Sequence, residues 1–269
     1  MTLHYTFQDL HPYINWIYFY HAWQLRQPEQ QQRIRREAEQ FMLELGDRYQ
    51  AHALFTIFKA YSEGDDIIIS TGETTFTLPL LRQQTGTPPY LCLSDFIAPL
   101  TGSMPQDQIG LFATSVDQGI EHDFDDDPYQ KMMAQLLADR LAEAAAERMH
   151  EEVRKHYWGY APDERLSMKE MHQELFQGIR PAVGYPSLPD ASLNFILDRL
   201  LGFSQIGISL TESAAMRPHA SVSGLMLSHP KARYFSVGMI GPDQLADYAR
   251  RRGITLERTR QFLSANLMV

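Results

Sequence analysis

The loop from Gly178 to Pro186, with the sequence GIRPAVGYP, carries the most distinctive set of chemical groups in the chain. It combines one guanidinium group, two glycines, two prolines and an aromatic ring. Glycine lets a ligand approach the backbone closely, proline restricts the shape of the loop, and the planar guanidinium of Arg180 can bind a carboxylate through two hydrogen bonds. The loop therefore indicates a site for a small carboxylate ligand. Taken alone, it would also fit a rigid turn that carries a surface arginine.

The segments on either side of this loop are expected to be helices. The longest helix is expected over residues 127–158, because Asp127 is a good N-cap and a proline follows it. A Ser-x-x-Glu capping box starts a second helix, expected over residues 167–178 and ending where the loop begins. A third helix is expected over residues 190–201, before a glycine.

The N-terminal half mixes helical and strand patterns. Apolar residues at spacings of three and four predict an amphipathic helix over residues 28–45, and an aromatic stretch predicts a buried helix over residues 13–23. Around an acidic turn at residues 63–66 the apolar period shortens, which predicts a β-hairpin. Further short strands are expected at residues 90–93 and 109–113.

In the C-terminal part, residues 222–228 and 234–240 flank the sequence HPKA, which predicts an antiparallel hairpin. Because side chains alternate along a strand, Phe235 would pack inside and Tyr234 would be free to face a ligand. Two short helices are expected to close the chain, at residues 242–252 and 256–263.

Strands and helices come in blocks without a strict β-α-β alternation, which favours an α+β fold with a mainly antiparallel sheet. A length of 269 residues is compatible with one domain. No repeat or flexible linker divides the chain. We expect residues 1–50 to form a helical segment that packs as one unit with the main domain, residues 51–269.

Composition excludes several classes of protein. With 24 basic and 33 acidic residues the formal net charge is -9, which disfavours nucleic acid as a partner. Cys92 is the sole cysteine, so an internal disulfide and a cysteine-based metal cluster are excluded. The sequence shows no signal peptide and no apolar stretch long enough to span a membrane, so we expect a cytoplasmic protein.

Two other segments suggest alternative functions. Residues 122–127, HDFDDD, are rich in possible cation ligands but lack the spacing of a calcium loop, and acidic residues also stabilise the start of a helix. Residues 243–260 resemble a helix-turn-helix with several arginines, which leaves a ligand-responsive DNA-binding protein as a rival hypothesis. Retention on DNA that depends on salt would distinguish that rival.

Several motifs together resemble one family. They occur in that family's order and spacing and extend over nearly the whole chain: LSDFIAP, ADRLAEAAAERMHEEVRKHYWGYAP, GIRPAVGYP, LTESAAM, ASVSG, SHPKARYF and DQLADYARRRG. The chain is similar to the S-adenosylmethionine-binding activation domain of cobalamin-dependent methionine synthase. The resemblance implies a single C-shaped α+β domain, with a twisted antiparallel sheet and flanking helices, that binds S-adenosylmethionine in an extended groove.

The resemblance also implies which residues bind this ligand. The side-chain contacts fall on Asp95, Arg180 and the pair Tyr234 and Phe235, and the backbone contacts fall on Ala182, Gly184 and Tyr185. The chemistry is consistent, because a methionine carboxylate suits Arg180, its ammonium suits Asp95, and a sulfonium or adenine can lie against a tyrosine ring.

Three acidic residues are also implied in the site. Glu143 and Glu174 match acidic positions near the groove, and Asp139 matches the residue that accepts the histidine displaced from cobalt during reactivation. Read without the family, all three fit equally well as ordinary carboxylates on a helix surface.

The sequence departs from the family pattern at several positions. Proline is expected where Val183 stands, cysteine near Leu188, and tryptophan and glycine where Arg217 and His219 stand; aromatic residues are expected at Leu225 and Met226. None of these is an implied side-chain ligand, but all could reshape the surface that faces the corrinoid.

No D-x-H-x-x-G cobalamin motif and no G-x-G-x-x-G dinucleotide motif is present. We therefore expect a free-standing activation component that acts on cobalamin carried by the cobalamin-binding module of methionine synthase, with a flavodoxin-like reductant implied by the family. The reduced cobalt is the nucleophile in this chemistry, so no acid, base or nucleophilic side chain of the chain itself is required. An autonomous methyltransferase, which would turn over without any corrinoid, is the remaining rival.

Overall fold

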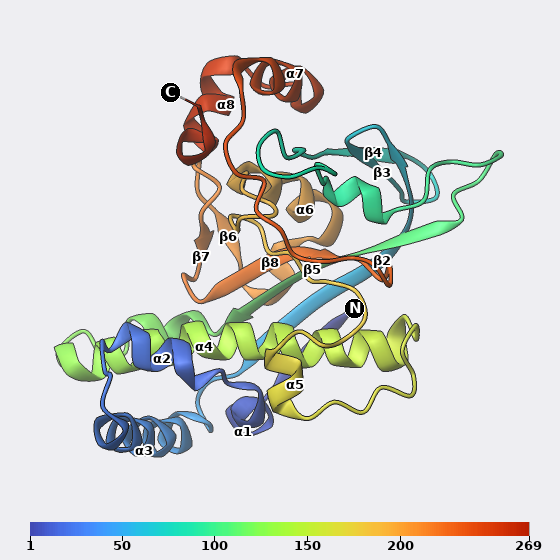
Figure 1. Ribbon diagram of the computed structural model, residues 1–269. Coiled ribbons are helices and arrows are strands. Elements are labelled where there is room, and N and C mark those ends of the chain that lie inside the picture. The colour runs from blue at the N-terminus through green and yellow to red at the C-terminus, as the bar shows by residue number, and fades with distance from the viewer. Residues whose placement is uncertain (269) are drawn as a thin grey trace.

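The structure is a computed structural model that describes residues 1–268, and its centre is a six-stranded antiparallel sheet (Figure 1). The strand order is β4-β3-β2-β5-β8, and β1 pairs with β2. The strands of this sheet are β1 (Thr2–Tyr5), β2 (Ala51–Glu63), β3 (Asp66–Ser70), β4 (Thr75–Pro79), β5 (Asp107–Val116) and β8 (Ser221–Met226). This arrangement confirms the α+β class and the mainly antiparallel sheet.

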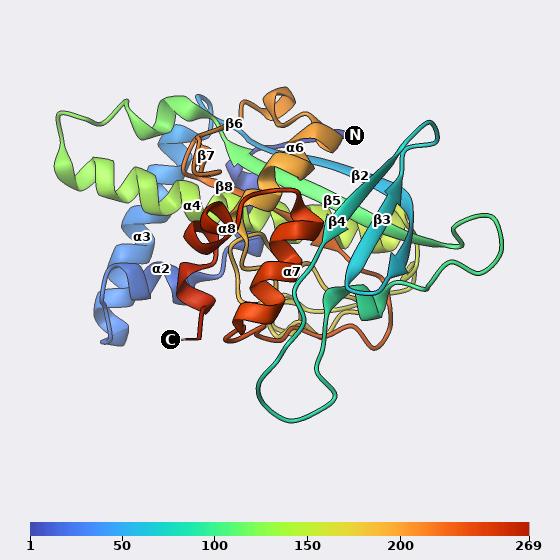
Figure 2. The ribbon, with the colours of Figure 1, turned by 90° about the horizontal axis from the view of Figure 1, so that it is seen from above.

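The long strand β2 organises the sheet, because it pairs with β1, β3 and β5. Glu63 pairs with Asp66 across a tight turn, which confirms the hairpin predicted at residues 63–66. The short strand predicted at residues 109–113 lies within the longer β5. Figure 2 shows β2 and β5 running side by side across the molecule.

A layer of helices covers one face of the sheet (Figure 1). It consists of α1 (Phe7–Leu10), α2 (Trp16–Ala22), α3 (Pro28–Leu45), α4 (Pro128–Glu152) and α5 (Met168–His172). Asp127 caps α4 by accepting hydrogen bonds from two backbone N–H groups. Alanines on α4, among them Ala138, Ala142 and Ala145, are fully buried. Their small side chains let α4 lie close to β5, where Thr114 donates a hydrogen bond to the backbone of Ala142 over 2.9 Å.

The opposite face of the sheet packs against a second apolar cluster that includes α6 (Asn194–Leu201). The last helices, α7 (Pro242–Arg252) and α8 (Leu256–Phe262), enclose a small third cluster around Tyr248. A two-stranded ribbon, β6 (Ser209–Leu210) and β7 (Met216–Arg217), completes the regular structure. Short 3-10 turns lie at His11–Tyr13, Leu93–Phe96, Gln118–Glu121, Ala191–Leu193, Phe203–Ile206 and Ser264–Asn266.

The first fifty residues are not purely helical, because β1 is a strand of the central sheet. Their buried side chains, including Phe7, Phe19 and Ala38, belong to the same apolar cluster as the buried face of α4. Only one side of α2 is buried, since Ile17 and Tyr18 are exposed.

Several helix predictions hold and others require correction. The helices predicted at residues 28–45 and 242–252 match α3 and α7 in full, and α4 continues into a short π-helix at Val153–Tyr157. The second predicted helix stops early: α5 ends at His172, because Glu174 adopts a φ of 58°, which a right-handed helix does not permit. Residues 90–93 form no strand, since the chain enters a 3-10 turn at Leu93.

The hairpin predicted from residues 222–228 and 234–240 does not form. The edge of β8 that it would need is occupied by residues 179–183, which hydrogen-bond to the backbone of β8 and of Leu227 just after it. Residues 234–239 form an irregular segment instead, in which Val237 donates to the backbone of Pro186 over 2.9 Å. The sequence pattern therefore identified the strand β8 correctly, but the strand predicted at residues 234–240 and its pairing with β8 were wrong.

The acidic segment at residues 122–127 stabilises local structure. Asp123 accepts a hydrogen bond from Tyr49, Asp125 pairs with Lys131, and Asp127 caps α4. Among residues 1–268, no group of three or more histidine, cysteine or acidic side chains is arranged to hold a metal ion. Nor does any helix of this part of the chain have the length and apolar character needed to cross a membrane.

Candidate functional site

The loop that carries Arg180 is held against the free edge of β8 by isolated β-bridges. Ile179 and Leu227 exchange two backbone hydrogen bonds of 2.9 and 3.0 Å, and Leu225 donates to Pro181 over 3.0 Å. Val183 donates to Ser223 over 2.9 Å. The backbone on both sides of Arg180 is therefore fixed by the sheet.

Two glycines make this close pairing possible. A Cβ atom on Gly178 would lie 2.3 Å from the carbonyl oxygen of Leu227, and one on Gly224 would lie 2.2 Å from that of Pro181. Gly178 also has a φ of 84°, in the region that favours glycine. Glycine at these positions lets the loop lie directly on the strand.

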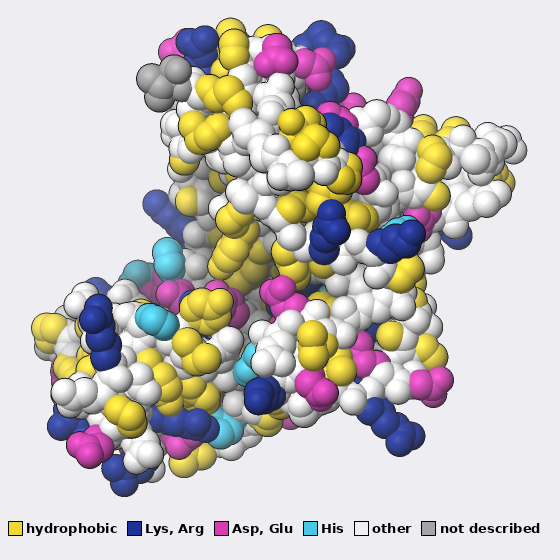
Figure 3. All heavy atoms as spheres, in the orientation of Figure 1, with side chains coloured by type: hydrophobic (Ala, Val, Ile, Leu, Met, Phe, Trp, Pro, Cys, Tyr) yellow, Lys and Arg dark blue, Asp and Glu magenta, His cyan; other side chains and the backbone are white. Residues whose placement is uncertain are grey.

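A cavity of about 740 Å³ lies beside this loop. Its walls come from α2, α4, the end of α5, the loop and residues 234–235. In Figure 3 the surface is hollowed where the helical layer at the bottom meets the upper part of the molecule. The cavity brings together predicted site residues that are far apart in the sequence: Glu143, Glu174, Arg180, Ala182, Tyr185, Tyr234 and Phe235.

Arg180 is one of the two arginines that line this cavity, the other being Arg140. Its side chain is only 16% exposed, and its Nη2 lies 3.2 Å from Oε2 of Glu147 on α4. Burial acts to lower the pKa of Arg180, but the charge and hydrogen bond of Glu147, together with Tyr234 and Glu143, outweigh it and raise the pKa above its ordinary value. Arg180 therefore stays charged and can bind an anionic group in the cavity.

Tyr234 approaches Arg180 from the irregular segment that replaces the predicted hairpin. Its hydroxyl accepts a hydrogen bond of 2.9 Å from the backbone N–H of Arg180, and burial raises its pKa. Phe235 packs partly into the apolar clusters while also lining the cavity. Tyr234 thus faces the cavity as predicted, but Phe235 lines it as well, so the strict alternation of a strand does not hold here.

Acidic side chains form another part of the wall. Glu143 accepts a hydrogen bond of 2.8 Å from Arg140 and a longer one of 3.4 Å from the hydroxyl of Tyr185. Burial raises the pKa of Glu174, an effect that the charge of Arg180 opposes. The cavity is therefore lined by two arginines, Arg140 and Arg180, and by several carboxylates, a distribution suited to a ligand that carries both signs of charge.

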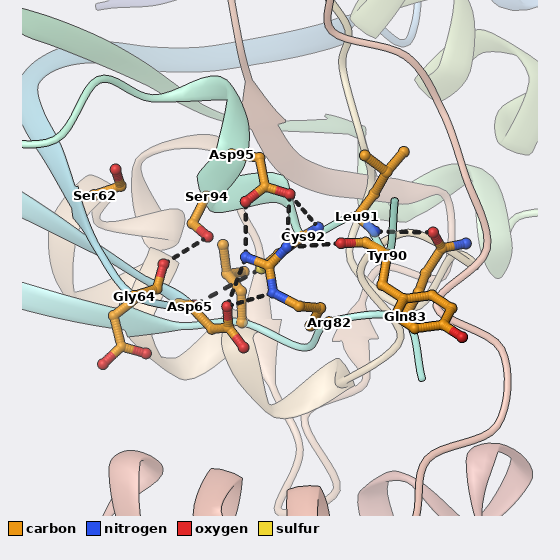
Figure 4. Close-up of polar contacts among 12 residues, drawn as sticks. Ser62, Gly64, Asp65, Arg82, Gln83, Tyr90, Leu91, Cys92, Ser94 and Asp95 are labelled. Carbon is orange, nitrogen blue, oxygen red and sulfur yellow. Dashed lines mark hydrogen bonds and ion pairs between the residues drawn. The ribbon is translucent and has the colours of Figure 1, made fainter. Parts of the chain in front are cut away.

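Two of the predicted ligand contacts, Gly184 and Asp95, are not among the residues that line the cavity. Gly184 has a φ of 87°, and its N–H donates to the backbone of Leu188 over 2.8 Å within the loop. Asp95 lies in the 3-10 turn Leu93–Phe96, where its two carboxylate oxygens accept hydrogen bonds of 2.7 and 2.8 Å from Arg82 (Figure 4). The structure does not bring Asp95 into contact with Arg180, so its role stays a prediction.

Asp139 lies in a smaller cavity of about 170 Å³ that shares Arg140, Glu143 and Tyr185 with the larger one. Its carboxylate lies 3.1 Å from Nδ1 of His219. The backbone N–H of His219 donates to Glu121, which fixes this part of the chain next to Asp139. In this protein a histidine of the chain itself therefore already contacts the carboxylate.

Sequence reasoning missed Glu147 and His150, which lie closest to the guanidinium of Arg180. The signal for Glu147 was present, because Asp139, Glu143 and Glu147 follow one another at intervals of four on one face of a helix. No role was predicted from the sequence for His150, which is fully buried.

Comparison with known proteins agrees with this arrangement. A family model described as "Vitamin B12 dependent methionine synthase, activation domain" matches residues 6–253. A solved structure described as "Crystal Structure of the MetH Reactivation Domain bound to AdoHcy" is 38% identical in sequence, with a TM-score of 0.93. The match covers 100% of this chain and 90% of that one.

Proposed function

This chain belongs to the family of vitamin B12-dependent methionine synthase activation domains, and from that membership we propose that it binds S-adenosylmethionine in the cavity beside Arg180. The volume of about 740 Å³ lies within the range usual for small-molecule sites. The buried, charged Arg180 is the observation that carries the proposal, because a cation held over a cavity selects a ligand with an anionic group.

The groups of the ligand have matching groups in the wall. The methionine carboxylate is assigned to Arg180 through two charge-assisted hydrogen bonds. The positive sulfonium suits a cavity lined by Glu143 and Glu174, and an aromatic surface is available at Tyr234. For the ammonium, the proposal keeps Asp95, whose carboxylate already accepts from Arg82 and from the backbone N–H of Cys92 and has lone-pair capacity for one further donor.

We further propose that the bound ligand serves the reductive methylation of cob(II)alamin on a partner. The cobalamin belongs to the cobalamin-binding module of methionine synthase, and a flavodoxin-like protein supplies one electron. The methyl group then passes from the ligand sulfur to the reduced cobalt, and S-adenosylhomocysteine remains. In this scheme the chain's own side chains act by binding and orienting the ligand so that its methyl group faces the partner.

Asp139 is proposed to accept the histidine that leaves cobalt on the partner. In this protein the imidazole of His219 already contacts the carboxylate of Asp139, so the partner's histidine has to displace His219. The side chain of His219 is 88% exposed, and an exposed polar contact of this kind contributes only about 0–1 kcal/mol, so its displacement costs little free energy. His219→Ala is expected to speed reactivation by no more than a few-fold.

The experiment that tests the function is reactivation in trans. This protein, S-adenosylmethionine and a low-potential reductant are added to a compatible synthase that lacks its own activation domain, and methylcobalamin is followed by its absorption spectrum. Arg180→Ala serves as the control that lacks the ligand-binding group. Formation of methylcobalamin only with the unsubstituted protein supports the proposal; none at any protein concentration, with a folded and cobalamin-loaded partner, refutes reactivation in trans.

The alternative of DNA binding is not favoured by any observation. The arginines of α7 that suggested it are paired within the molecule: Arg250 with Asp247, Arg251 with Asp66 and Arg252 with Asp190. Cations that already have acidic partners offer little attraction for phosphates.

A further inference from the structure

A row of charged and polar side chains runs from the interior of the protein to the cavity. It begins at Glu164, whose carboxylate binds the guanidinium of Arg154, with a shortest contact of 2.6 Å between Oε1 and Nη2. Next comes His150, whose Nδ1 lies 2.9 Å from Nη1 of Arg154. The same Nδ1 lies 3.5 Å from Nη1 of Arg180, and Glu147 stands on the far side of Arg180.

The two arginines determine the tautomer and the protonation state of His150. Guanidinium nitrogens only donate hydrogen bonds, so Nδ1 must be an acceptor and the ring proton must be on Nε2. The single lone pair of Nδ1 is shared between the shorter contact from Arg154 and the longer one from Arg180. Nε2 faces the hydroxyl of Tyr160 at 3.4 Å. Complete burial and the charges of Arg154 and Arg180 hold the pKa of His150 well below its usual range, so the imidazole is neutral.

Packing fixes the position of the ring. His150 and Arg154 are both fully buried, the ring of His150 meets the ring of Phe176 edge-on at 5.1 Å, and the guanidinium of Arg154 lies over the same ring at 4.2 Å. An acceptor held this rigidly limits the positions that the guanidinium of Arg180 can adopt, whereas an arginine held by Glu147 alone could rotate about that single contact.

We propose that His150 is a positioning residue, which uses its neutral Nδ1 to hold the guanidinium of Arg180 in the orientation that binds the ligand carboxylate. This inference rests on the proposed function, because it assigns the ligand carboxylate to Arg180. His150 touches no part of the ligand in this arrangement. Its effect is confined to the carboxylate end of the ligand, because the rest of the ligand makes no contact with Arg180.

Two related ligands separate this role from a general structural one. S-adenosylhomocysteine carries the amino-acid carboxylate, whereas 5′-methylthioadenosine has the same adenosine and thioether without it. Calorimetry with both is expected to show that His150→Leu lowers the affinity for S-adenosylhomocysteine about tenfold and leaves the affinity for 5′-methylthioadenosine unchanged. His150→Asn is expected to restore most of the loss, because its amide oxygen lies near the position of Nδ1.

Leu141→Ala is the matched control, since Leu141 is fully buried on the same helix and does not line the cavity. It lowers stability without removing a contact to Arg180, so the affinity for both ligands is expected to stay unchanged. If His150→Leu does not fold, His150→Gln replaces it, because the glutamine amide lies near Nε2 and is not expected to restore the contact.

An equal loss of affinity for both ligands in His150→Leu, or no loss of affinity for either, would overturn the positioning role. The role is also overturned if His150→Asn binds S-adenosylhomocysteine no better than the leucine or glutamine variant. A separate outcome, in which the unsubstituted protein binds neither ligand, contradicts the proposed function itself and removes the inference with it.

Discussion

Replacing Arg180 with alanine is the most direct test of how this cavity recognises its ligand. The substitution removes a guanidinium group that is 16% exposed and therefore largely shielded from water. A charge-assisted hydrogen-bonded contact to a carboxylate is worth about 1.5–3 kcal/mol, which corresponds to a loss of affinity of roughly 10- to 150-fold. Arg180→Lys keeps the charge but cannot make two parallel hydrogen bonds, so it is expected to bind only slightly better than the alanine variant.

The assay is titration calorimetry with S-adenosylmethionine at fixed ionic strength, together with urea unfolding of each variant. Unfolding matters because the alanine variant leaves Glu147 in a largely buried position without its cation, and removing one partner of such a pair is destabilising. The double variant Arg180→Ala, Glu147→Ala removes both partners and is expected to recover part of that stability while still binding weakly. Equal affinity in the unsubstituted protein and in a folded Arg180→Ala variant would show that Arg180 is not a ligand contact.

Four further predictions follow from the same structure. Gly224→Ala is expected to lower the free energy of unfolding in urea by about 1–3 kcal/mol and to lower the affinity for S-adenosylmethionine, because its Cβ would lie 2.2 Å from the carbonyl oxygen of Pro181. Unchanged stability would contradict the close packing of the loop. Asp139→Asn is expected to slow reactivation while leaving the affinity for S-adenosylmethionine unchanged, and a large loss of affinity would place Asp139 in the ligand site instead. The isolated protein is expected to bind no cobalamin tightly, so a stoichiometric corrinoid spectrum after purification would be evidence against a partner-supplied cofactor. Because burial and the charges of Arg154 and Arg180 hold the pKa of His150 well below its ordinary value, protons favour the unfolded chain as the pH falls; urea unfolding should therefore show a larger loss of stability between about pH 7.5 and 5.5 for the unsubstituted protein than for His150→Asn.

The sequence predicted best those elements whose signals are local. The cap at Asp127, the apolar spacing of α3 and the acidic turn between β2 and β3 each depend on neighbouring residues, and all three are found in the structure. The segment that pairs with β8, by contrast, depends on which part of the chain the tertiary structure places at its edge. Residues 179–183 contain a proline and are flanked by Gly178 and Gly184, which are typical of irregular structure, and nothing in their pattern indicated that they would pair with a strand.

The same distinction applies to the site. Arg180, Tyr234 and Glu143 were identified through family motifs, and the structure places all three around one cavity. Glu147 and His150 were missed because charged and polar residues on a helix are usually exposed, so sequence alone offers no reason to place them in the interior. Their burial results from the packing of α4 under the loop, which is a property of the tertiary structure.

The pairing of residues 179–183 with β8 also affects how readily this protein can aggregate. An unpaired sheet edge offers a row of free backbone groups to which another chain can add, and natural proteins cover such edges to avoid aggregation. Here the cover is the same loop that carries Arg180. Substitutions that loosen the loop would therefore expose the edge of β8, and their first visible effect would be self-association during expression or storage, before any measurement of ligand binding reveals a defect.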